Sequence, residues 1–258
     1  QQITASGTEN HSITITSPIA GSGNQFNTNI NNVTIQGARL NGTGNIFWIN
    51  NRTMQSGYIP VVSDAFQITG MILETGKNLI QVQSFKGDGT CLTDEIIVNY
   101  EPAGYSGPVI SSVAISKPTV KQYERTDITF TLQTIADHLY FPFDTIMPGN
   151  LNSGSGISVD VIFTNGPVTL RQPAFFNMDY TRESDHLMPT GNNAWTTRMA
   201  FRETGTWTSS IVARDAAGES AIAGPTVTVL PDSSNGGYIR VSATDNRYFE
   251  YESGRPFI

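Results

Sequence analysis

The sequence predicts an all-β protein with two tandem immunoglobulin-like, Greek-key β-sandwiches and a short C-terminal two-strand tail. Small polar residues dominate the 258-residue chain, with 30 Thr, 22 Ser, 20 Asn and 24 Gly, whereas charged residues make up only 14% of it. Lys, which favours helices, occurs only four times. Short runs rich in Thr, Val, Ile and aromatic residues, which favour strands, recur between turn-forming clusters of Gly, Asn and Asp.

The first sandwich is expected over residues 1–102. Turn-forming clusters there separate seven short runs that are typical of strands. The last run shows the alternation most clearly, because Ile96, Val98 and Tyr100 share one face that should pack on a core. The seven expected strands are 12–18, 32–37, 45–50, 58–62, 65–73, 78–85 and 93–100.

The second sandwich is expected over residues 109–231, after a Pro- and Gly-rich linker at 103–108. Two segments within it, 137–156 and 178–193, contain no clear strand pattern and are expected to form long loops, which are usually functional or mobile. The seven expected strands are 109–116, 127–136, 157–164, 168–177, 194–202, 207–214 and 226–230.

The remaining residues, 232–258, read as a linker followed by two strands, at 238–242 and 248–252. A two-stranded hairpin is at best marginally stable by itself in water. We therefore expect this tail to begin a further domain or to be exchanged with another chain. Glu250 and Glu252 alternate at period two, which indicates a solvent-facing side of the second strand.

Composition excludes several functional classes. The net charge of −7 and the isoelectric point near 4.9 leave no basic footprint for a nucleic acid. No apolar run reaches the length that a membrane-spanning helix needs. Cys91, as the single cysteine, cannot form an intrachain disulfide and is expected to be buried in a strand. Low charge and the absence of an initiator Met suit a secreted or cell-surface bacterial protein, or an excised fragment of one.

Residues 12–102 resemble a bacterial immunoglobulin-like accessory domain of the glucodextranase B-domain type. The resemblance rests on ITSP at 15–18, VTIQGARLNG at 33–42, and the long segment at 65–100 that contains GKNLIQV and ends in IIVNY. It implies a non-catalytic module of a secreted bacterial protein.

Residues 109–258 are similar to the β-sandwich that precedes the catalytic barrel in some bacterial glycoside hydrolases. The motifs occur in the same order: YERTDITFTL (123–132), VDVIFTNG (159–166), PAFFNMDY (173–180), the segment 194–218, and RYFEYESGRPFI (247–258). In that family the final segment leads into the first barrel strand, and the catalytic carboxylates lie in the barrel. The resemblance therefore assigns no catalytic residue to this chain.

Aromatic residues are the candidate carbohydrate-binding groups, because sugar CH faces stack on exposed rings. Tyr140 and Tyr180 are favoured by their place in the two expected loops, where Phe141 also lies. Trp207 is expected in the core instead, and Trp48 can face either way. The full set of predicted carbohydrate-binding residues is Tyr140, Tyr180, Trp195, Trp48 and Tyr58.

Candidate metal ligands lie in the same expected loops. Asp179, Glu183 and Asp185 can supply oxygen ligands to a structural calcium ion, although their spacing is not that of an EF-hand. His138 and His186 can hold a metal if the two loops meet. No Ser–His–acid arrangement or paired-carboxylate motif is recognisable, so an enzyme is not expected and no other cofactor is indicated.

Four N-x-S/T sequons are confined to the first expected domain, at Asn10, Asn32, Asn41 and Asn51. Such sequons arise readily in a chain rich in Asn and Thr. They have chemical meaning only in a host that glycosylates asparagine.

The sequence favours two functions over a third, a self-contained enzyme. The first is a non-catalytic, extracellular module pair that spaces or helps to bind a polysaccharide for a glycan-degrading protein. The second is a structural subunit of an extracellular filament or surface layer, which would assemble as a homo-oligomer when the tail adds its strands to a sheet edge of another subunit.

Overall fold

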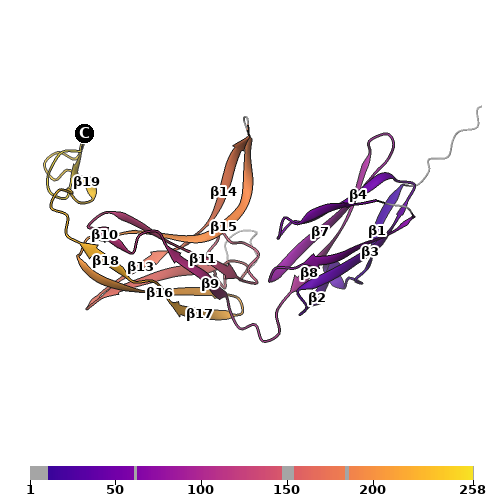
Figure 1. Ribbon diagram of the computed structural model, residues 1–258, viewed down its shortest axis with the longest axis horizontal. Coiled ribbons are helices and arrows are strands. Elements are labelled where there is room, and N and C mark those ends of the chain that lie inside the picture. The colour runs from indigo at the N-terminus through magenta and orange to yellow at the C-terminus, as the bar shows by residue number, and fades with distance from the viewer. Residues whose placement is uncertain (1–10, 61–62, 147–153, 184–185, 258) are drawn as a thin grey trace, which may run out of the picture. The chain divides into compact units, whose positions relative to one another are not determined.

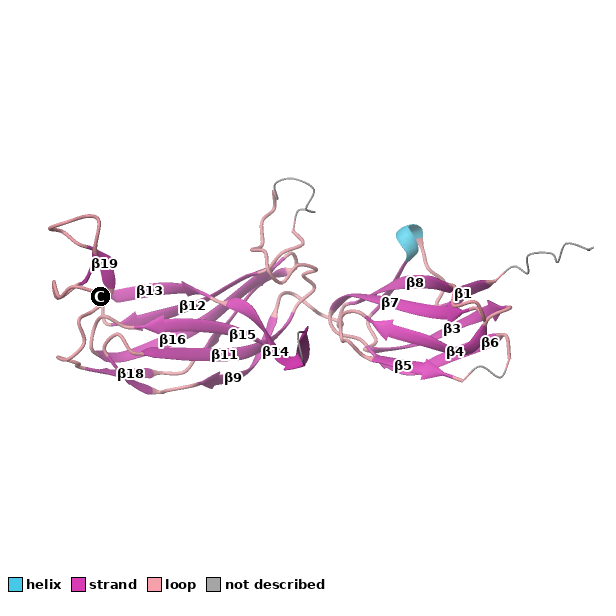
Figure 2. Cartoon of the chain, turned by 90° about the horizontal axis from the view of Figure 1, so that it is seen from above, coloured by secondary structure: helices cyan, strands magenta, loops and turns pink. Residues whose placement is uncertain are grey.

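The computed structural model describes residues 11–60, 63–146, 154–183 and 186–257, excluding the side chains at 183, 186, 188–189 and 191–193. The predicted all-β fold is confirmed: the described residues form strands and one short 3-10 turn, η1 (Ser22–Asn24) (Figure 2). In the described part of the chain, no helix is long and apolar enough to cross a membrane. The chain divides into two compact units, Gln1–Tyr105 and Ser106–Ile258.

The first unit is a sandwich of a three-stranded sheet, β1-β3-β6, and a five-stranded sheet, β2-β8-β7-β4-β5 (Figure 1). The short strand β2 pairs in parallel with β8 and was not predicted, because Phe26 is its only hydrophobic residue. The strands are β1 (Ser12–Ser17), β2 (Gln25–Thr28), β3 (Asn32–Leu40), β4 (Thr43–Asn50), β5 (Ser56–Ile59), β6 (Ala65–Ile72), β7 (Gly76–Phe85) and β8 (Cys91–Tyr100).

The core of the first unit follows the alternation in the sequence. Along β3, every second residue is buried, including Val33 and Ile35, which pack with Ile46 and Ile80 of the facing sheet. Gly37 takes one of these inward positions. A Cβ atom there would lie 2.2 Å from the ring of Phe66, so only glycine leaves room for that ring.

The second unit is also a sandwich, with sheets β10-β18-β16-β12-β13 and β14-β15-β11-β9; β17 pairs with β16 as well. Its strands are β9 (Val109–Ile115), β10 (Thr119–Lys121), β11 (Arg125–Gln133), β12 (Ser158–Asn165), β13 (Val168–Pro173), β14 (Phe175–Glu183), β15 (His186–Ala200), β16 (Gly205–Asp215), β17 (Gly218–Ala223) and β18 (Val227–Leu230).

The strand predicted at 168–177 is two strands in different sheets. β13 pairs with β12, whereas β14 pairs with β15 in the opposite sheet, and the chain crosses between the sheets at Ala174. Pro173 ends the first ladder at a residue that has no N–H to donate. The backbone N–H of Ala174 still donates to Val159, at 2.8 Å, and this bond ties the crossing to the edge of β12.

The long loop predicted at 178–193 is wrong. The described residues 178–183 and 186–193 instead continue β14 and β15 as antiparallel strands that extend beyond the sandwich (Figure 1). The alternation of a half-buried strand is missing there because the described side chains at 179–182, 187 and 190 are all exposed. The strands β10 and β17 were also missed, because β10 has only three residues and β17 contains a single large hydrophobic residue, Ile222.

Aromatic side chains fill the centre of the second sandwich. Three of them are at most 1% exposed: Phe163, Phe201 and Trp207. The ring centroids of Phe163 and Phe201 lie 5.1 Å apart, and those of Phe201 and Trp207 lie 4.9 Å apart. Trp207 also donates from its indole nitrogen to the carbonyl of Glu203, at 3.2 Å. The prediction that Trp207 is a core residue is therefore confirmed.

The C-terminal tail forms a hairpin of β19 (Ile239–Val241) and β20 (Phe249–Tyr251) that docks on the second sandwich. Tyr238 provides the main contact: its ring meets Tyr123 edge-on at 5.2 Å, and its hydroxyl donates to the carbonyl of Ala200. The guanidinium of Arg202 lies 5.9 Å from the same ring and pairs with Glu252.

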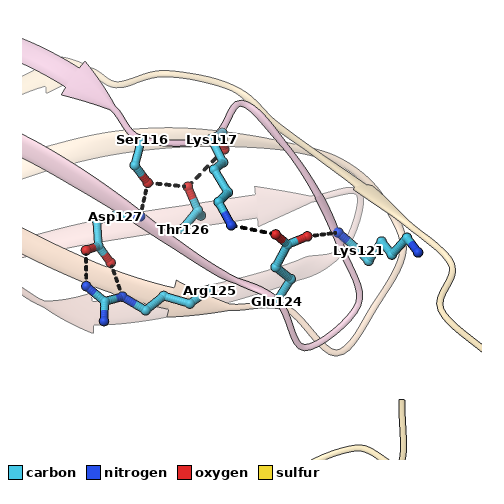
Figure 3. Close-up of polar contacts among 7 residues, drawn as sticks. All are labelled: Ser116, Lys117, Lys121, Glu124, Arg125, Thr126 and Asp127. Carbon is cyan, nitrogen blue, oxygen red and sulfur yellow. Dashed lines mark hydrogen bonds and ion pairs between the residues drawn. The ribbon is translucent and has the colours of Figure 1, made fainter. Parts of the chain in front are cut away.

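Two ion pairs lie close together in the second sandwich, one between the turns on either side of β10 and one within β11 (Figure 3). The carboxylate of Glu124 accepts from Lys117 Nζ at 2.6 Å and from the backbone N–H of Lys121 at 3.0 Å. Asp127 accepts two hydrogen bonds from Arg125, one of them from Nε at 2.8 Å. Hydrogen bonds from Arg125 lower the pKa of Asp127, and those from Lys117 and Lys121 lower the pKa of Glu124.

Replacing Tyr238 with Ala is expected to release the tail from the second sandwich. Amide hydrogen exchange should then rise across 239–257 and stay unchanged in β11, β12 and β16. Burial raises the pKa of the Tyr238 phenol. Docking should accordingly be complete below the ordinary tyrosine pKa of about 10 and weaken as pH rises above it. A Tyr248→Ala variant, which removes a more exposed ring, is the control, and equal exchange in both variants would contradict the docking role.

Replacing Asp127 with Asn should destabilise the protein at neutral pH and cease to matter in acid. The folded-state pKa of Asp127 is lowered, so its stabilisation is present above the ordinary aspartate pKa of about 3.9 and is lost as pH falls below it. Urea denaturation at pH 7 and pH 2.5 measures the difference between variant and wild type. A difference that persists at the lower pH would show that the ion pair is not its source.

Candidate functional site

The crossing from β13 to β14 leaves a hollow of about 530 Å³ at the edge of the second sandwich. Its base is formed by buried side chains, among them Ile157, Val159 and Trp195. Its rim carries the exposed rings of Tyr140 and Phe141, together with Phe175. The volume falls within the range of about 300–1,000 Å³ that is usual for small-ligand sites.

The segment that carries Tyr140 and Phe141 is held at both ends. Upstream, the buried carboxylate of Asp215 accepts from the hydroxyl of Thr134, at 2.7 Å. Downstream, the carbonyl of Phe141 accepts from the backbone N–H of Ile157, at 2.8 Å. These bonds position the two aromatic residues on the rim without burying their rings, which remain 66% and 43% exposed.

Tyr140 joins the rim to the extended hairpin. Its hydroxyl lies 2.7 Å from the sulfur of Met178, and the hydroxyl of Tyr180 lies 3.8 Å from the same sulfur. Below, its ring meets Phe176 edge-on at 5.7 Å, and Phe176 lies 5.8 Å from Trp195. The structure thus brings together three residues that were predicted to bind carbohydrate: Tyr140, Tyr180 and Trp195.

A charged pair stands beside the aromatic rim. Asp160 of β12 accepts from Arg171 Nη2 of β13 at 2.5 Å. The side chain of Asp160 is 12% exposed, whereas that of Arg171 is 70% exposed, so the pair presents mainly its guanidinium to solvent. The hydrogen bond to Asp160 raises the pKa of Arg171. Together, the pair offers N–H donors and a carboxylate acceptor next to the stacking surfaces.

The predicted aromatic residues differ in their exposure. Trp195 is only 4% exposed and belongs to the core, so its predicted role as a stacking surface is wrong; the alternation of β15 turns it inward at the base of the hollow. Trp48 is half-buried against the first core and packs on Gly57. Tyr58 is 70% exposed, lies 5.2 Å from Phe47 on the outer face, and does not line the hollow.

Only part of the predicted metal site can be described. Asp179 is exposed, and its carboxylate accepts from the amide of Asn177, at 3.0 Å. The side chains of Glu183, Asp185 and His186 lie outside the described residues. His138 lies beside Phe141, 6.0 Å from its ring. Among the described residues, no three His, Cys, Asp or Glu side chains gather in a way that could hold a metal ion.

Three sequon asparagines lie on the surface of the first unit: Asn32, Asn41 and Asn51. The fourth, Asn10, lies outside the described residues. Cys91 is exposed at the start of β8, so the prediction that it is buried is wrong. It occupies the first position of the strand, where the sheet no longer covers it.

The prediction of a solvent-facing strand at Glu250 is also wrong. Glu250 is 8% exposed and accepts hydrogen bonds from Arg240 and Ser242. These bonds and the backbone N–H of Ala243 lower its pKa, and the bond from Ser242 has the largest effect. Glu252, which follows β20, is also paired, with Arg202.

Sequence reasoning missed three residues that line the hollow, Asp160, Arg171 and Phe175, and also Met178, which contacts Tyr140. The opposite charges of Asp160 and Arg171 gave no signal, since their pairing depends on the register of β12 against β13. Pro173 was the one local indication, because a proline inside a strand pattern marks an edge or an end.

Comparisons with known proteins identify no family. No family model matches the chain, and no curated protein matches it. A protein classed as a glycoside hydrolase from Bacteroides vulgatus is 16% identical over 55% of this chain, with a TM-score of 0.30, and the chain spans 21% of its length.

Two further solved structures cover more of the chain. The fibronectin(III)-like modules of Clostridium thermocellum CbhA are 14% identical, with 87% of this chain and 97% of theirs covered and a TM-score of 0.26. SGBP-B of the Bacteroides ovatus mixed-linkage glucan utilization locus, solved in complex with a mixed-linkage heptasaccharide, is 16% identical, with 86% of this chain and 48% of its own covered and a TM-score of 0.27. Likenesses this low are no argument for a function.

Proposed function

We propose that this protein is a non-catalytic pair of extracellular β-sandwich modules that binds polysaccharide through the hollow at the β13–β14 crossing. The observation that carries the proposal is the combination of exposed rings on the rim, Tyr140 and Phe141, with the hydrogen-bonding pair of Asp160 and Arg171 beside them. Aromatic faces and a few well-placed polar groups are what a sugar ring requires of a binding site.

The charges at the hollow favour binding over hydrolysis. Glycosidases need two carboxyl groups on either side of the scissile bond. Among the described residues that line the hollow, Asp160 is the one carboxylate, so the second carboxyl group that hydrolysis needs is missing from this lining. A role in holding the polysaccharide for a separate catalytic part therefore suits the site better than catalysis.

The sequence resemblance supports a more specific form of the proposal. The order of motifs from residue 123 to residue 258 resembles the sandwich that precedes a glycoside hydrolase barrel, and residues 12–102 resemble a glucodextranase B-type domain. We therefore place the protein outside a bacterial cell, secreted or at the surface, as an accessory region of a glycan-degrading protein.

Replacing Tyr140 with Ala should weaken glycan binding by about 2 kcal/mol, or roughly 30-fold in Kd, as expected for an exposed aromatic residue central to an interface. Affinity electrophoresis against a panel of polysaccharides finds the ligand, and isothermal titration measures the change. Tyr140→Phe should keep most of the affinity, because the ring remains.

Tyr58→Ala is the matched control, since it removes an equally exposed tyrosine from the first unit. Loss of binding in this variant but not in Tyr140→Ala would move the site to the first sandwich. If no polysaccharide retards the wild-type protein, the proposed function is wrong.

Strand addition by the tail is the second candidate function. The observation in its favour is that one face of the hairpin is open, with Ile239, Val241 and Phe249 each about half exposed. An uncovered apolar face on a short hairpin is suited to pairing with a second copy of the chain, which would add beside β19 because residues 255–257 already bond to β20. Against it stands the docking of the tail on its own sandwich through Tyr238.

Multi-angle light scattering over a range of concentrations tests strand addition. If the tail assembles the protein, the wild type should form oligomers and Val241→Lys should be monomeric, because a lysine on the open face opposes pairing. Leu187→Lys, at an exposed site on the β14–β15 hairpin, is the control and should still assemble. A wild-type protein that stays monomeric contradicts this function.

A further inference from the structure

Building on the proposed glycan binding, we propose that the hollow selects uncharged glycans and that the Asp160–Arg171 pair recognises two neighbouring hydroxyl groups of the sugar. The inference rests on the charges that line the hollow, on how they are already paired, and on the charge of the whole chain.

The lining of the hollow is electrically neutral. Among the described lining residues, Asp160 and Arg171 are the two that are charged at neutral pH, and they neutralise each other at 2.5 Å. The other lining side chains are apolar or aromatic, apart from Ser158. Because Arg171, the cation of the described lining, is already paired with Asp160, a sugar carboxylate in the hollow would find no unpaired cation there.

Competition for Arg171 disfavours an acidic sugar. A uronate could bind the guanidinium only by displacing Asp160, whose side chain is 12% exposed, or by joining it. Displacement leaves a mostly buried carboxylate unpaired, and joining it places two carboxylates on one cation; both arrangements are costly. The charge of Glu219 acts on Arg171 as well.

Neighbouring guanidinium groups have contacts of their own. Arg198 lies over the rim residue Phe175, 5.1 Å from the ring centroid, and its Nε is 3.6 Å from the carboxylate of Asp127, which it shares with Arg125. Arg214 lies over Phe143, which is outside the lining, at 4.9 Å. The net charge of −7 adds a repulsion that acts on any polyanion before contact.

A neutral sugar fits the same groups without these costs. Its ring faces stack on Tyr140 and Phe141, and its hydroxyl groups both donate and accept hydrogen bonds. Because Arg171 remains 70% exposed, it has N–H groups to donate to one hydroxyl oxygen, while the carboxylate of Asp160 accepts from the next hydroxyl. The pair stays intact when the sugar binds.

Affinity electrophoresis with two sets of polysaccharides tests the selectivity. The neutral set is mixed-linkage β-glucan, galactomannan and starch, and the acidic set is polygalacturonate and alginate. We expect a neutral glycan to bind at least about tenfold more tightly than any acidic one, since like charges oppose the second group. Retardation mainly by the acidic set overturns the selectivity but leaves glycan binding standing, whereas no retardation by either set overturns the proposed function itself.

An isosteric variant tests the charged pair directly. Asp160→Asn keeps an acceptor of the same shape but frees Arg171, so the preference for the neutral set should fall and binding to polygalacturonate should appear. Asp232→Asn changes the net charge equally, on an exposed linker, and should leave the preference unchanged. If the ratio of affinities is the same in Asp160→Asn as in wild type, with the melting curve showing a folded protein, the role of the pair is overturned.

If Asp160→Asn does not fold, Arg171→Gln provides the second test, since its side chain is mostly exposed. This variant should weaken neutral-glycan binding severalfold while Tyr140 still stacks. Unchanged affinity would show that the pair does not contact the sugar.

Discussion

The crossing of one strand pair between two sheets determines the candidate site. β13 and β14 are consecutive in the chain, yet they belong to opposite sheets, and a single residue, Ala174, joins them. Pro173 has no N–H and so cannot donate a further hydrogen bond to the sheet. The N–H of Ala174 donates to the carbonyl of Val159 in β12. The sheets therefore part at this edge, and the hollow forms where none of the described strands covers the core.

Several contacts around this crossing have a double role. Trp195 and Phe176 belong to the core or pack against it, and they also form the base of the hollow. Asp215, buried beside Thr134, closes the turn into β17 and at the same time anchors the segment that carries Tyr140. A rigid core thus holds exposed aromatic rings in place, which lowers the entropy that binding must lose. Rings on a free loop would not have this advantage.

The C-terminal hairpin shows how a short element can be stable on a larger one. Two strands of three residues each contain too little apolar surface to fold alone. Tyr238 supplies the missing contact through Tyr123 and the carbonyl of Ala200, and Arg202 joins the hairpin to the sandwich a second time through Glu252. The polar face of the hairpin is closed by Arg240 and Glu250, while its apolar face remains open.

The sequence by itself determined the all-β class, most strands and the core positions of residues such as Ile96, Val98 and Trp207, because burial on one face of a strand imposes alternation with period two. It also singled out Tyr140 and Tyr180. Only the tertiary structure decided that 178–183 and 186–193 form antiparallel strands, that Trp195 points inward, and that Asp160 meets Arg171. The described side chains in the extended part of these strands are exposed and therefore leave no alternating pattern, and the ion pair depends on the register of β12 against β13, which local sequence does not determine.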